Sequence, residues 1–265
     1  MSKALKYLIL IILIVSPIIF YKASNKQNNY SQAARSLSND KLFVLPKIAL
    51  IFDDLGESLN ELKRLYSLEI PLTISIIPNL KFSRNIAHIG ARCGFSIFIH
   101  LPCEPDNKTK TSSLNYNFIS GDLNKRDVES LLRRYLNSIR IAVGVNNHMG
   151  SKATQNTELM KLVMNAIKKR DLVFIDSRTS LDSVAYNVAN QEGLECGYNE
   201  GFLDAVDSQE EIGKRMNSLI GKAKEKGKII VIAHPRENTI NFLEKNLPEI
   251  KKKIDFITIN DYFDI

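Results

Sequence analysis

Short apolar runs, each ending in polar residues, recur along this chain. The runs are rich in β-branched and aromatic side chains, which is typical of strands buried on both faces. Stretches with the helical spacing of apolar residues lie between them. This alternation predicts one α/β domain of parallel strands joined by helices in right-handed crossovers. The runs that matter most are residues 48–54, 95–100, 143–148, 172–178 and 229–234.

The residues at the ends of these runs predict a shared site. The C-terminal ends of parallel strands open onto one rim of a barrel or one edge of an open sheet, and active sites are built there. Three of the four histidines stand at such ends. Imidazole and carboxylate are natural ligands for Zn²⁺ or a related divalent ion. The pattern therefore predicts a metal-assisted hydrolytic site that contains Asp53, Asp54, His100, His148, Asp176, Arg178 and His234.

The adjacent carboxylates of Asp53 and Asp54 are the strongest single signal. Two neighbouring carboxylates repel each other unless a cation or a shared proton holds them. An acid at this position also suits a helix N-cap, where it complements the helix dipole. We favour metal binding or acid–base chemistry because there are two acids and a turn at Gly56 follows them. His88 lies on a predicted helix, and we expect it to have no role in the site.

Four further residues beside these strand ends are candidates to contact substrate or to support a ligand: Glu104, Asn147, Asp176 and Arg178. Glu104 follows His100 in the segment HLPCEP, where it is either a second ligand or a solvent-facing loop carboxylate. Asp176 and Arg178 form either a structural ion pair or a pair that tunes a histidine and holds substrate. Asn147 directly precedes His148.

The charge of the chain argues against nucleic-acid binding. The formal net charge is +7, but residues 1–47 hold seven basic residues and one acid. Residues 48–265 hold 29 basic and 28 acidic residues, so the folded part is nearly neutral. An electrostatic footprint for DNA or RNA is therefore not expected on the domain.

The N-terminal segment predicts a membrane anchor. Residues 7–21 carry no charge and lie between Lys6 and Lys22. As a helix they would rise roughly 22 Å, which approaches the ~30 Å hydrocarbon core if the lysines snorkel. A cleaved signal peptide is the alternative, but the candidate sites near Ala23 and Ser24 lack the expected small residues upstream. We expect a signal anchor at residues 1–21, a polar linker at 22–47, and the 48–265 domain outside the cytoplasm, in the periplasm or cell envelope.

Five motifs in the order IFDDLG, HLPCEP, GVNNHMGS, FIDSRT and AHP resemble the divergent polysaccharide deacetylase family, relatives of the NodB-type polysaccharide deacetylases. The resemblance covers about residues 47–263. It implies a distorted (β/α) barrel of about seven parallel strands. It also implies a metal-dependent hydrolase of carbohydrate metabolism that removes N-acetyl groups from an envelope glycan.

The resemblance implies roles for individual residues. Asp53 takes the place of the catalytic base, Asp54 that of a metal ligand and His234 that of the general acid. The family's H-x-x-x-H metal pair is incomplete here, because Glu104 stands where the second histidine is expected after His100. His148 is our candidate replacement, and Arg178 is a candidate for the family's arginine. The alternative to an enzyme is a non-catalytic envelope protein that uses the same rim to bind a glycan or another protein.

Overall fold

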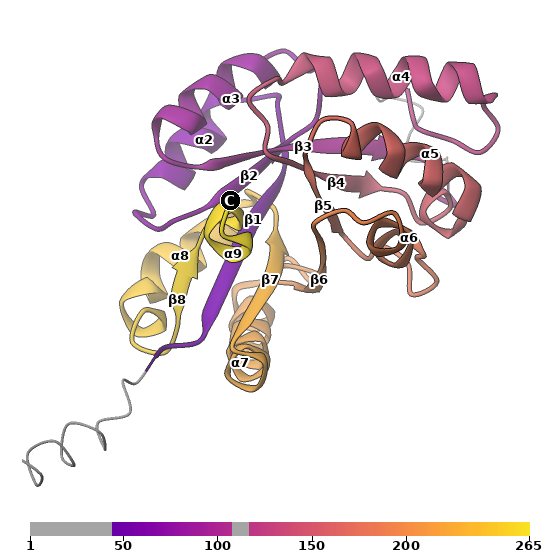
Figure 1. Cartoon of the computed structure of the whole chain (residues 1–265). Coiled ribbons are helices and arrows are strands. Elements are labelled where there is room, and N and C mark those ends of the chain that lie inside the picture. Colours follow the sequence, from indigo (N-terminus) through magenta and orange to yellow (C-terminus); the bar gives the residue numbers. More distant parts are fainter. Residues whose placement is uncertain (1–43, 108–116) are drawn as a thin grey trace, which may run out of the picture. The chain divides into compact units, whose positions relative to one another are not determined.

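Seven parallel strands close into a barrel, and an eighth strand extends it beside β1 (Figure 1). The computed structural model describes residues 44–107 and 117–265. The strand order is β2-β3-β4-β5-β6-β7-β1, and the pairing of β1 with β2 closes the ring. The predicted distorted (β/α) barrel is thereby confirmed. The strands are β1 (Lys47–Leu55), β2 (Thr73–Ile76), β3 (Ser96–Cys103), β4 (Gly144–Met149), β5 (Val173–Asp176), β6 (Cys196–Phe202), β7 (Lys228–Ala233) and β8 (Asp255–Ile257).

Helices surround the barrel and bury their apolar faces against it (Figure 1). Side-chain oxygens of polar residues cap several helix N-termini, as Asn124 does by accepting a hydrogen bond from the backbone N–H of Asp127. The helices are α2 (Leu59–Tyr66), α3 (Ser83–Arg92), α4 (Lys125–Ser138), α5 (Thr157–Lys168), α6 (Ala185–Gln191), α7 (Gln209–Lys226), α8 (Glu237–Ile250), α9 (Ile259–Phe263) and the short 3₁₀ helix η2 (Ala153–Gln155).

Side chains alternate along each strand between the helix layer and the barrel interior. On β1, Leu50 belongs to the core beneath the helices, whereas Ala49 and Ile51 belong to a second apolar cluster inside the barrel. The barrel interior is tightly packed. A Cβ on Gly144 would collide with the Phe98 ring and lie 2.6 Å from a Val173 methyl group. Small residues are therefore required where large ones already fill the interior.

One segment differs from its expected structure. Residues 196–202 have the appearance of an irregular stretch, because glycine and asparagine weaken the strand signal. The structure shows that they form strand β6, which pairs with β5 and β7 and is needed to close the barrel.

The N-terminal predictions fall mostly on residues that the structure does not describe. The expected anchor at 1–21 and nearly all of the linker at 22–47 lie outside the described residues. A compact unit spans Leu45–Ile265. Within the described part of the chain, none of the helices has the length and apolar character needed to cross a membrane.

Candidate metal centre and active site

The candidate site lies at the C-terminal ends of the strands. Each strand carries a row of side chains that face the barrel interior, and the last residue of several of these rows belongs to the site. Side chains two residues apart share a face of a strand, so the apolar row of Ala49 and Ile51 on β1 leads to Asp53 at its C-terminal end. On β7, Ile230 and Ile232 lead in the same way to His234. The polar ends of five such rows meet at one rim, and these ends are Asp53, His100, Asn146 with His148, Ser177 and His234.

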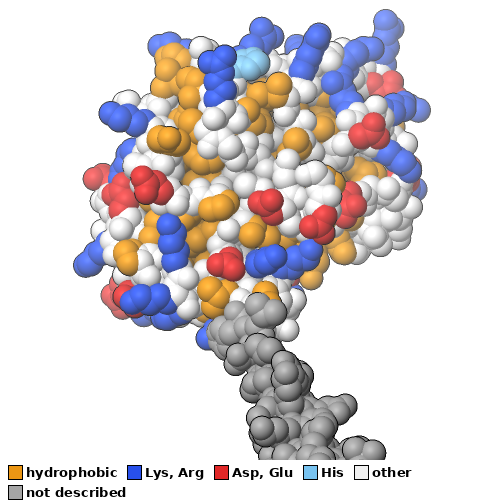
Figure 2. Space-filling view, turned by 60° about the vertical axis from the view of Figure 1, so that its left-hand side comes forward, with side chains coloured by type: hydrophobic (Ala, Val, Ile, Leu, Met, Phe, Trp, Pro, Cys, Tyr) orange, Lys and Arg blue, Asp and Glu red, His pale blue; other side chains and the backbone are white. Residues whose placement is uncertain are grey.

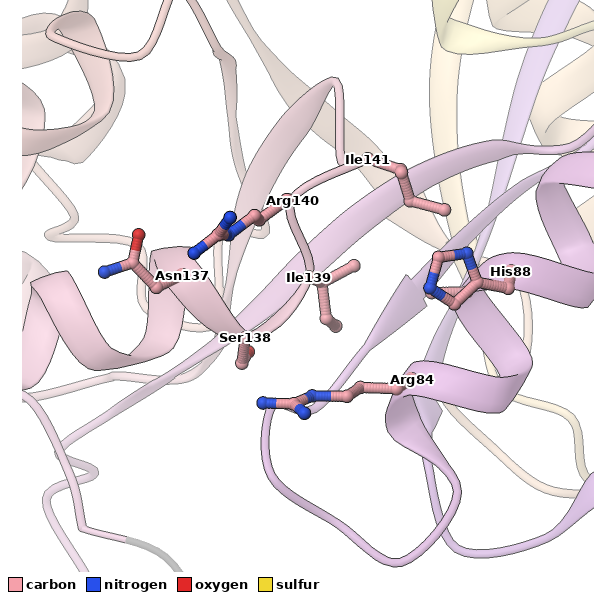
Figure 3. A pocket seen from close by; sticks show the side chains of 8 residues that line it. Arg84, His88, Asn137, Ser138, Ile139, Arg140 and Ile141 are labelled. Atoms are coloured by element: carbon pink, nitrogen blue, oxygen red, sulfur yellow. The ribbon is translucent and has the colours of Figure 1, made fainter.

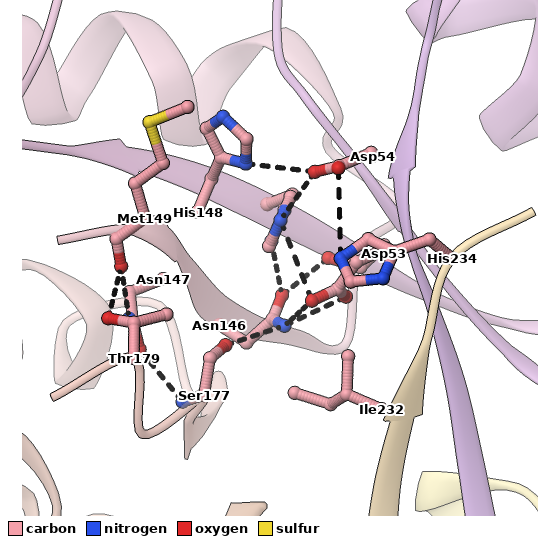
Figure 4. Close-up of polar contacts among 12 residues, drawn as sticks. Asp53, Asp54, Asn146, Asn147, His148, Met149, Ser177, Thr179, Ile232 and His234 are labelled. Carbon is pink, nitrogen blue, oxygen red and sulfur yellow. Dashed lines mark hydrogen bonds and ion pairs between the residues drawn. The ribbon is translucent and has the colours of Figure 1, made fainter. Parts of the chain in front are cut away.

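Asp54 joins these residues through an unusual backbone conformation. Its φ is 65°, in the left-handed region, and the register of β1 against β2 shifts between Phe52 and Leu55. Aspartate adopts this region more readily than most residues, but at some cost in free energy. The turn brings the Asp54 carboxylate to the same side of the rim as the histidines (Figure 4).

Asp54, His100 and His148 form a compact group of potential metal ligands. Oδ1 of Asp54 lies 2.9 Å from Nδ1 of His148 (Figure 4). The same oxygen lies 3.1 Å from Nε2 of His100. The three ligand atoms all lie within 4.8 Å of one another. Two imidazole nitrogens and one carboxylate oxygen are a donor set that suits Zn²⁺.

The protonation states of Asp54 and His148 favour binding of a cation. Oδ1 of Asp54 is buried and receives no N–H in hydrogen-bond geometry, although both rings approach it. Burial raises the pKa of Asp54, but the imidazoles of His100 and His148 outweigh it and hold that pKa well below its usual range. Burial lowers the pKa of His148 and so favours the neutral ring. An ionised carboxylate and a neutral imidazole are the forms that bind a metal.

Asn146 organises both the triad and its neighbour Asp53. Its amide nitrogen donates to the two carboxylate oxygens of Asp53 at 2.9 and 3.0 Å, so the opposite end of the amide is the oxygen. That oxygen accepts from Ser75 and lies 3.0 Å from Nδ1 of His100. Because an amide oxygen only accepts, Nδ1 of His100 carries the proton. Burial lowers the pKa of His100, but Asp53 and Asp54 outweigh it and raise that pKa, so a metal bound through Nε2 would replace the proton there.

We expect Asn146→Ala to weaken both the fold and metal binding. The change leaves Asp53 and Nδ1 of His100 without their buried partner, which should lower the free energy of unfolding by about 1–3 kcal/mol. Loss of a hydrogen bond behind a ligating histidine typically weakens metal affinity by about 10–100-fold. Urea unfolding and zinc titration measure the two effects.

Asn147→Ala is the matched control for that experiment. The side chain of Asn147 bonds to backbone groups, accepting from Ser177 N at 2.9 Å and donating to Met149 O at 2.8 Å. Its loss should cost stability but change zinc affinity by less than about threefold, since it does not touch the ligands. Equal zinc affinities for the two variants would contradict the role assigned to Asn146.

Asp53 lies beside the triad and is almost completely buried. Burial raises the pKa of Asp53 to about 6, against the opposing influence of His100 and His234. One of its oxygens lies 3.5 Å from Nε2 of His100. A carboxylate whose pKa is close to neutral can take up and return a proton under physiological conditions.

His234 is held by the carboxylate of Asp204, which no motif in the sequence indicates. Nδ1 of His234 lies 2.9 Å from Oδ1 of Asp204, whose other oxygen accepts from the His234 backbone N–H and from Thr239, each at 2.9 Å. Burial lowers the pKa of His234, but Asp204 and Asp54 outweigh it and raise that pKa. Nε2 is left free to face the site, 3.8 Å from Asp54 Oδ2. Asp204 lies two residues after the end of β6. A prediction of that strand from the sequence would therefore have placed Asp204 at the same rim as the other candidates.

A cavity of about 400 Å³ opens over this group. Asp53, Asp54, His100, His148 and His234 all line it, so one ligand can reach every group described above. Its size is in the usual range for small-molecule sites. Residues that the sequence did not indicate complete the wall, among them Met149, Thr179, Phe202 and Arg236.

Glu104 is neither a member of the triad nor a solvent-facing carboxylate. It is buried, and its carboxylate accepts from Ser120 at 2.6 Å and from Lys152 at 3.1 Å. Its backbone oxygen also accepts from Lys152 N and Ala153 N. Glu104 therefore connects the segment after β3 to the turn after β4, and the expectation of a solvent-facing carboxylate is corrected. His148 occupies the third position of the ligand group.

Asp176 and Arg178 also differ from expectation, because Asp176 follows Ile175 and so faces the helix layer rather than the barrel interior. Its carboxylate accepts from Ser183 at 2.8 Å and from the backbone N–H of Tyr186, near the start of α6. The Arg178 guanidinium lies 3.5 Å from the centre of the Tyr198 ring. In the part of the chain that the structure describes, no ion pair joins Asp176 to Arg178, and neither side chain lines the cavity.

Comparison with known proteins identifies relatives over most of the chain. The sequence is 31% identical to an uncharacterized protein of Haemophilus influenzae over 226 residues, which are 83% of this chain and 79% of that protein. It is 30% identical to the uncharacterized protein YibQ of Escherichia coli over 205 residues, or 76% of this chain and 63% of YibQ.

Three solved structures share the fold at low sequence identity. An uncharacterized protein of Agrobacterium tumefaciens superimposes with a TM-score of 0.76 at 19% identity, covering 83% of this chain and 89% of that one. The chitin deacetylase of Colletotrichum lindemuthianum gives 0.51 at 13% identity, covering 83% and 88%. A CE4-family pseudoenzyme of Bacillus anthracis gives 0.50 at 12% identity, covering 83% and 66%.

The family assignment follows from the sequence itself. Residues 50–263 match the divergent polysaccharide deacetylase family, and this range contains every strand-end residue of the rim site. The barrel and the positions of those residues agree with the match. The chain belongs to the divergent polysaccharide deacetylase family.

Proposed function

We propose that this protein is a metal-dependent hydrolase that removes N-acetyl groups from an envelope glycan. The observation that carries the proposal is the placement of Asp53 and Nε2 of His234 around the Asp54–His100–His148 triad, in one cavity. A site that only binds a glycan has no need for a buried base and an oriented acid beside a group of metal ligands.

The roles follow from the contacts of each residue. Asp54, His100 and His148 would hold the divalent ion, for which zinc is the best match to the donor set. Such an ion, when bound, supplies Lewis acidity toward the acetamide carbonyl and promotes deprotonation of water. Asp53 would take the proton from the attacking water, and Asn146 keeps its carboxylate in place. His234, oriented by Asp204, would protonate the departing amine through Nε2.

The test of this function is acetate release. Purified wild-type protein supplied with zinc should liberate acetate from N-acetylated glycans, such as chitin oligosaccharides or peptidoglycan fragments, and a chelator should stop the reaction. The CE4-family pseudoenzyme shows that the fold occurs without activity in that protein. A protein that retains its metal but releases no acetate from any of these glycans would favour the alternative, a non-catalytic member that binds a glycan or another protein.

We also propose that the N-terminal segment anchors the protein in a membrane, with the domain outside the cytoplasm. The uncharged residues 7–21, without a suitable cleavage site after them, support this topology. Cell fractionation should recover the full-length chain with membranes, and external protease should degrade the domain in spheroplasts. Recovery of a mature protein that lacks about its first 24 residues would indicate a processed, secreted form instead.

A further inference from the structure

The basic residues of the domain are concentrated in one part of the barrel wall. Residues 81–100 and 124–171 carry thirteen Lys or Arg and four Asp or Glu, whereas the rest of residues 48–265 carries sixteen basic and twenty-four acidic residues. Seven of the eleven arginines in residues 48–265 lie in the first group. The near-neutral sum therefore conceals a strongly basic region, which includes α3, α4 and α5. We call the outer surface of these helices, with the loop after α4, the basic face.

A cavity of about 320 Å³ lies on this face between α3 and the loop after α4. Arg84 and Arg140 lie on either side of Ile139, and His88 closes a third side (Figure 3). None of the described residues that line the cavity is acidic. Among the described residues, neither arginine takes part in an ion pair. Within residues 44–107 and 117–265, no carboxylate therefore pairs with the two guanidinium groups that line this hollow.

A second cavity, of about 500 Å³, adjoins the first at the end of α4. It lies between α4 and α5 and is lined by four cationic side chains, those of Lys125, Arg133, Lys169 and Arg170, and by one acid, Glu129. Arg170 donates to the Asn137 side chain at 2.6 Å, and Asn137 lines the first cavity. A hydrogen bond therefore connects the linings of the two cavities. Figure 2 shows Lys and Arg side chains gathered along the upper edge of that view, around an exposed histidine.

The chemistry of this face favours discrete anionic groups. Several exposed cations around one hollow create a positive potential that attracts an anion. The planar guanidinium matches phosphate and carboxylate in a bidentate manner. Adjoining hollows suit successive groups on an extended chain. Their apolar lining is aliphatic, with Ile139, Ile141, Leu136 and Leu162, and among the described residues the His88 imidazole is the one ring in it on which a nucleic-acid base could stack.

We propose that the basic face binds an anionic glycan, a sugar chain that carries phosphate or carboxylate groups. The choice of a glycan among polyanions rests on the proposed function. The basic face lies on the outer wall of the barrel. Its two cavities share no lining residue with the cavity of the rim site. Binding there would hold a charged chain against the protein independently of the chemistry at the rim.

The experiment compares glycan binding by two variants with the same change in net charge. Arg84→Gln with Arg140→Gln removes both guanidinium groups from the first cavity. Arg215→Gln with Lys224→Gln removes two exposed cations from α7, far along the chain from the basic face. Full-length proteins are titrated with oligogalacturonate, dextran phosphate and a neutral chitin oligosaccharide. We expect the first variant to bind an anionic glycan about tenfold or more weakly than wild type, and the α7 variant to lose less than about twofold.

The outcomes separate this inference from its alternatives. Equal losses in both variants, or no binding of either anionic glycan by wild type, would overturn it. Single-stranded oligothymidylate and phosphatidylglycerol vesicles serve as further probes. Tighter arginine-dependent binding of either one than of the glycans would reassign the face to nucleic acid or to lipid. Wild-type binding without acetate release would retain the basic face and refute only the proposed function, because the titration does not depend on turnover.

Discussion

Replacing Asp54 with alanine should abolish binding of the divalent ion, and so should His100→Ala and His148→Ala. Each change removes one of the three donor atoms that lie within 4.8 Å of one another. Loss of a residue that only supports a ligand typically weakens metal affinity by about 10–100-fold. Loss of a ligand itself should weaken it by more. Zinc content of the purified variants and calorimetric titration measure the effect. Retained affinity in any of the three would remove that residue from the metal site.

Two matched controls accompany these substitutions. Glu104→Gln should keep the metal, because the Glu104 carboxylate contacts Ser120 and Lys152 rather than the triad. His88→Ala should also keep it, because His88 lies on the exposed surface of α3. Loss of zinc from the Glu104→Gln protein would make Glu104 a ligand and demote His148. A wild-type protein that stays metal-free when supplied with zinc would refute the proposed mechanism.

Asp53→Asn and His234→Ala should each lower turnover by roughly 10²–10⁴-fold, the usual contribution of a positioned base or acid. The metal should remain bound in both variants, since neither residue belongs to the ligand group. Acetate release under saturating substrate, measured beside zinc content, separates lost chemistry from lost metal. Turnover within tenfold of wild type would mean that the residue is not the proton carrier.

Asp204→Asn tests the role of His234 through pH. The Asp204 carboxylate raises the pKa of His234, so its removal should lower that pKa. The general acid must be protonated, and activity is therefore lost as pH rises through its pKa. The alkaline limb of the pH–rate profile should consequently move to lower pH in the variant. An unchanged limb, with turnover reduced at every pH, would indicate that Asp204 only supports the fold.

The local sequence pattern was sufficient to predict the framework of the site. Buried strands that alternate with amphipathic helices require parallel pairing, and parallel pairing brings C-terminal strand ends together. Asp53, His100, His148 and His234 could therefore be grouped without any structure. Their positions at the rim follow from local periodicity, which each strand carries in its own residues.

Neighbouring residues at the same strand ends could not be told apart in this way. A shift of one residue moves a side chain to the other face of a strand. Asn146 rather than Asn147 therefore contacts Asp53 and His100, and Asp176 faces α6 while Ser177 faces the site. Which residue faces inward depends on the register of the closed barrel, and that register is set by pairing between distant segments.

What only the tertiary structure decided are the contacts between segments far apart in the chain. Glu104 is drawn away from His100 by Ser120 and Lys152, and Asp204 reaches His234 across 30 positions. The charges of residues 48–265 nearly cancel in the sequence, and it is the packing of α4 on α5, with α3 beside the loop after α4, that collects the arginines on one face. Composition and periodicity describe each segment by itself, whereas these contacts exist only after the barrel has closed.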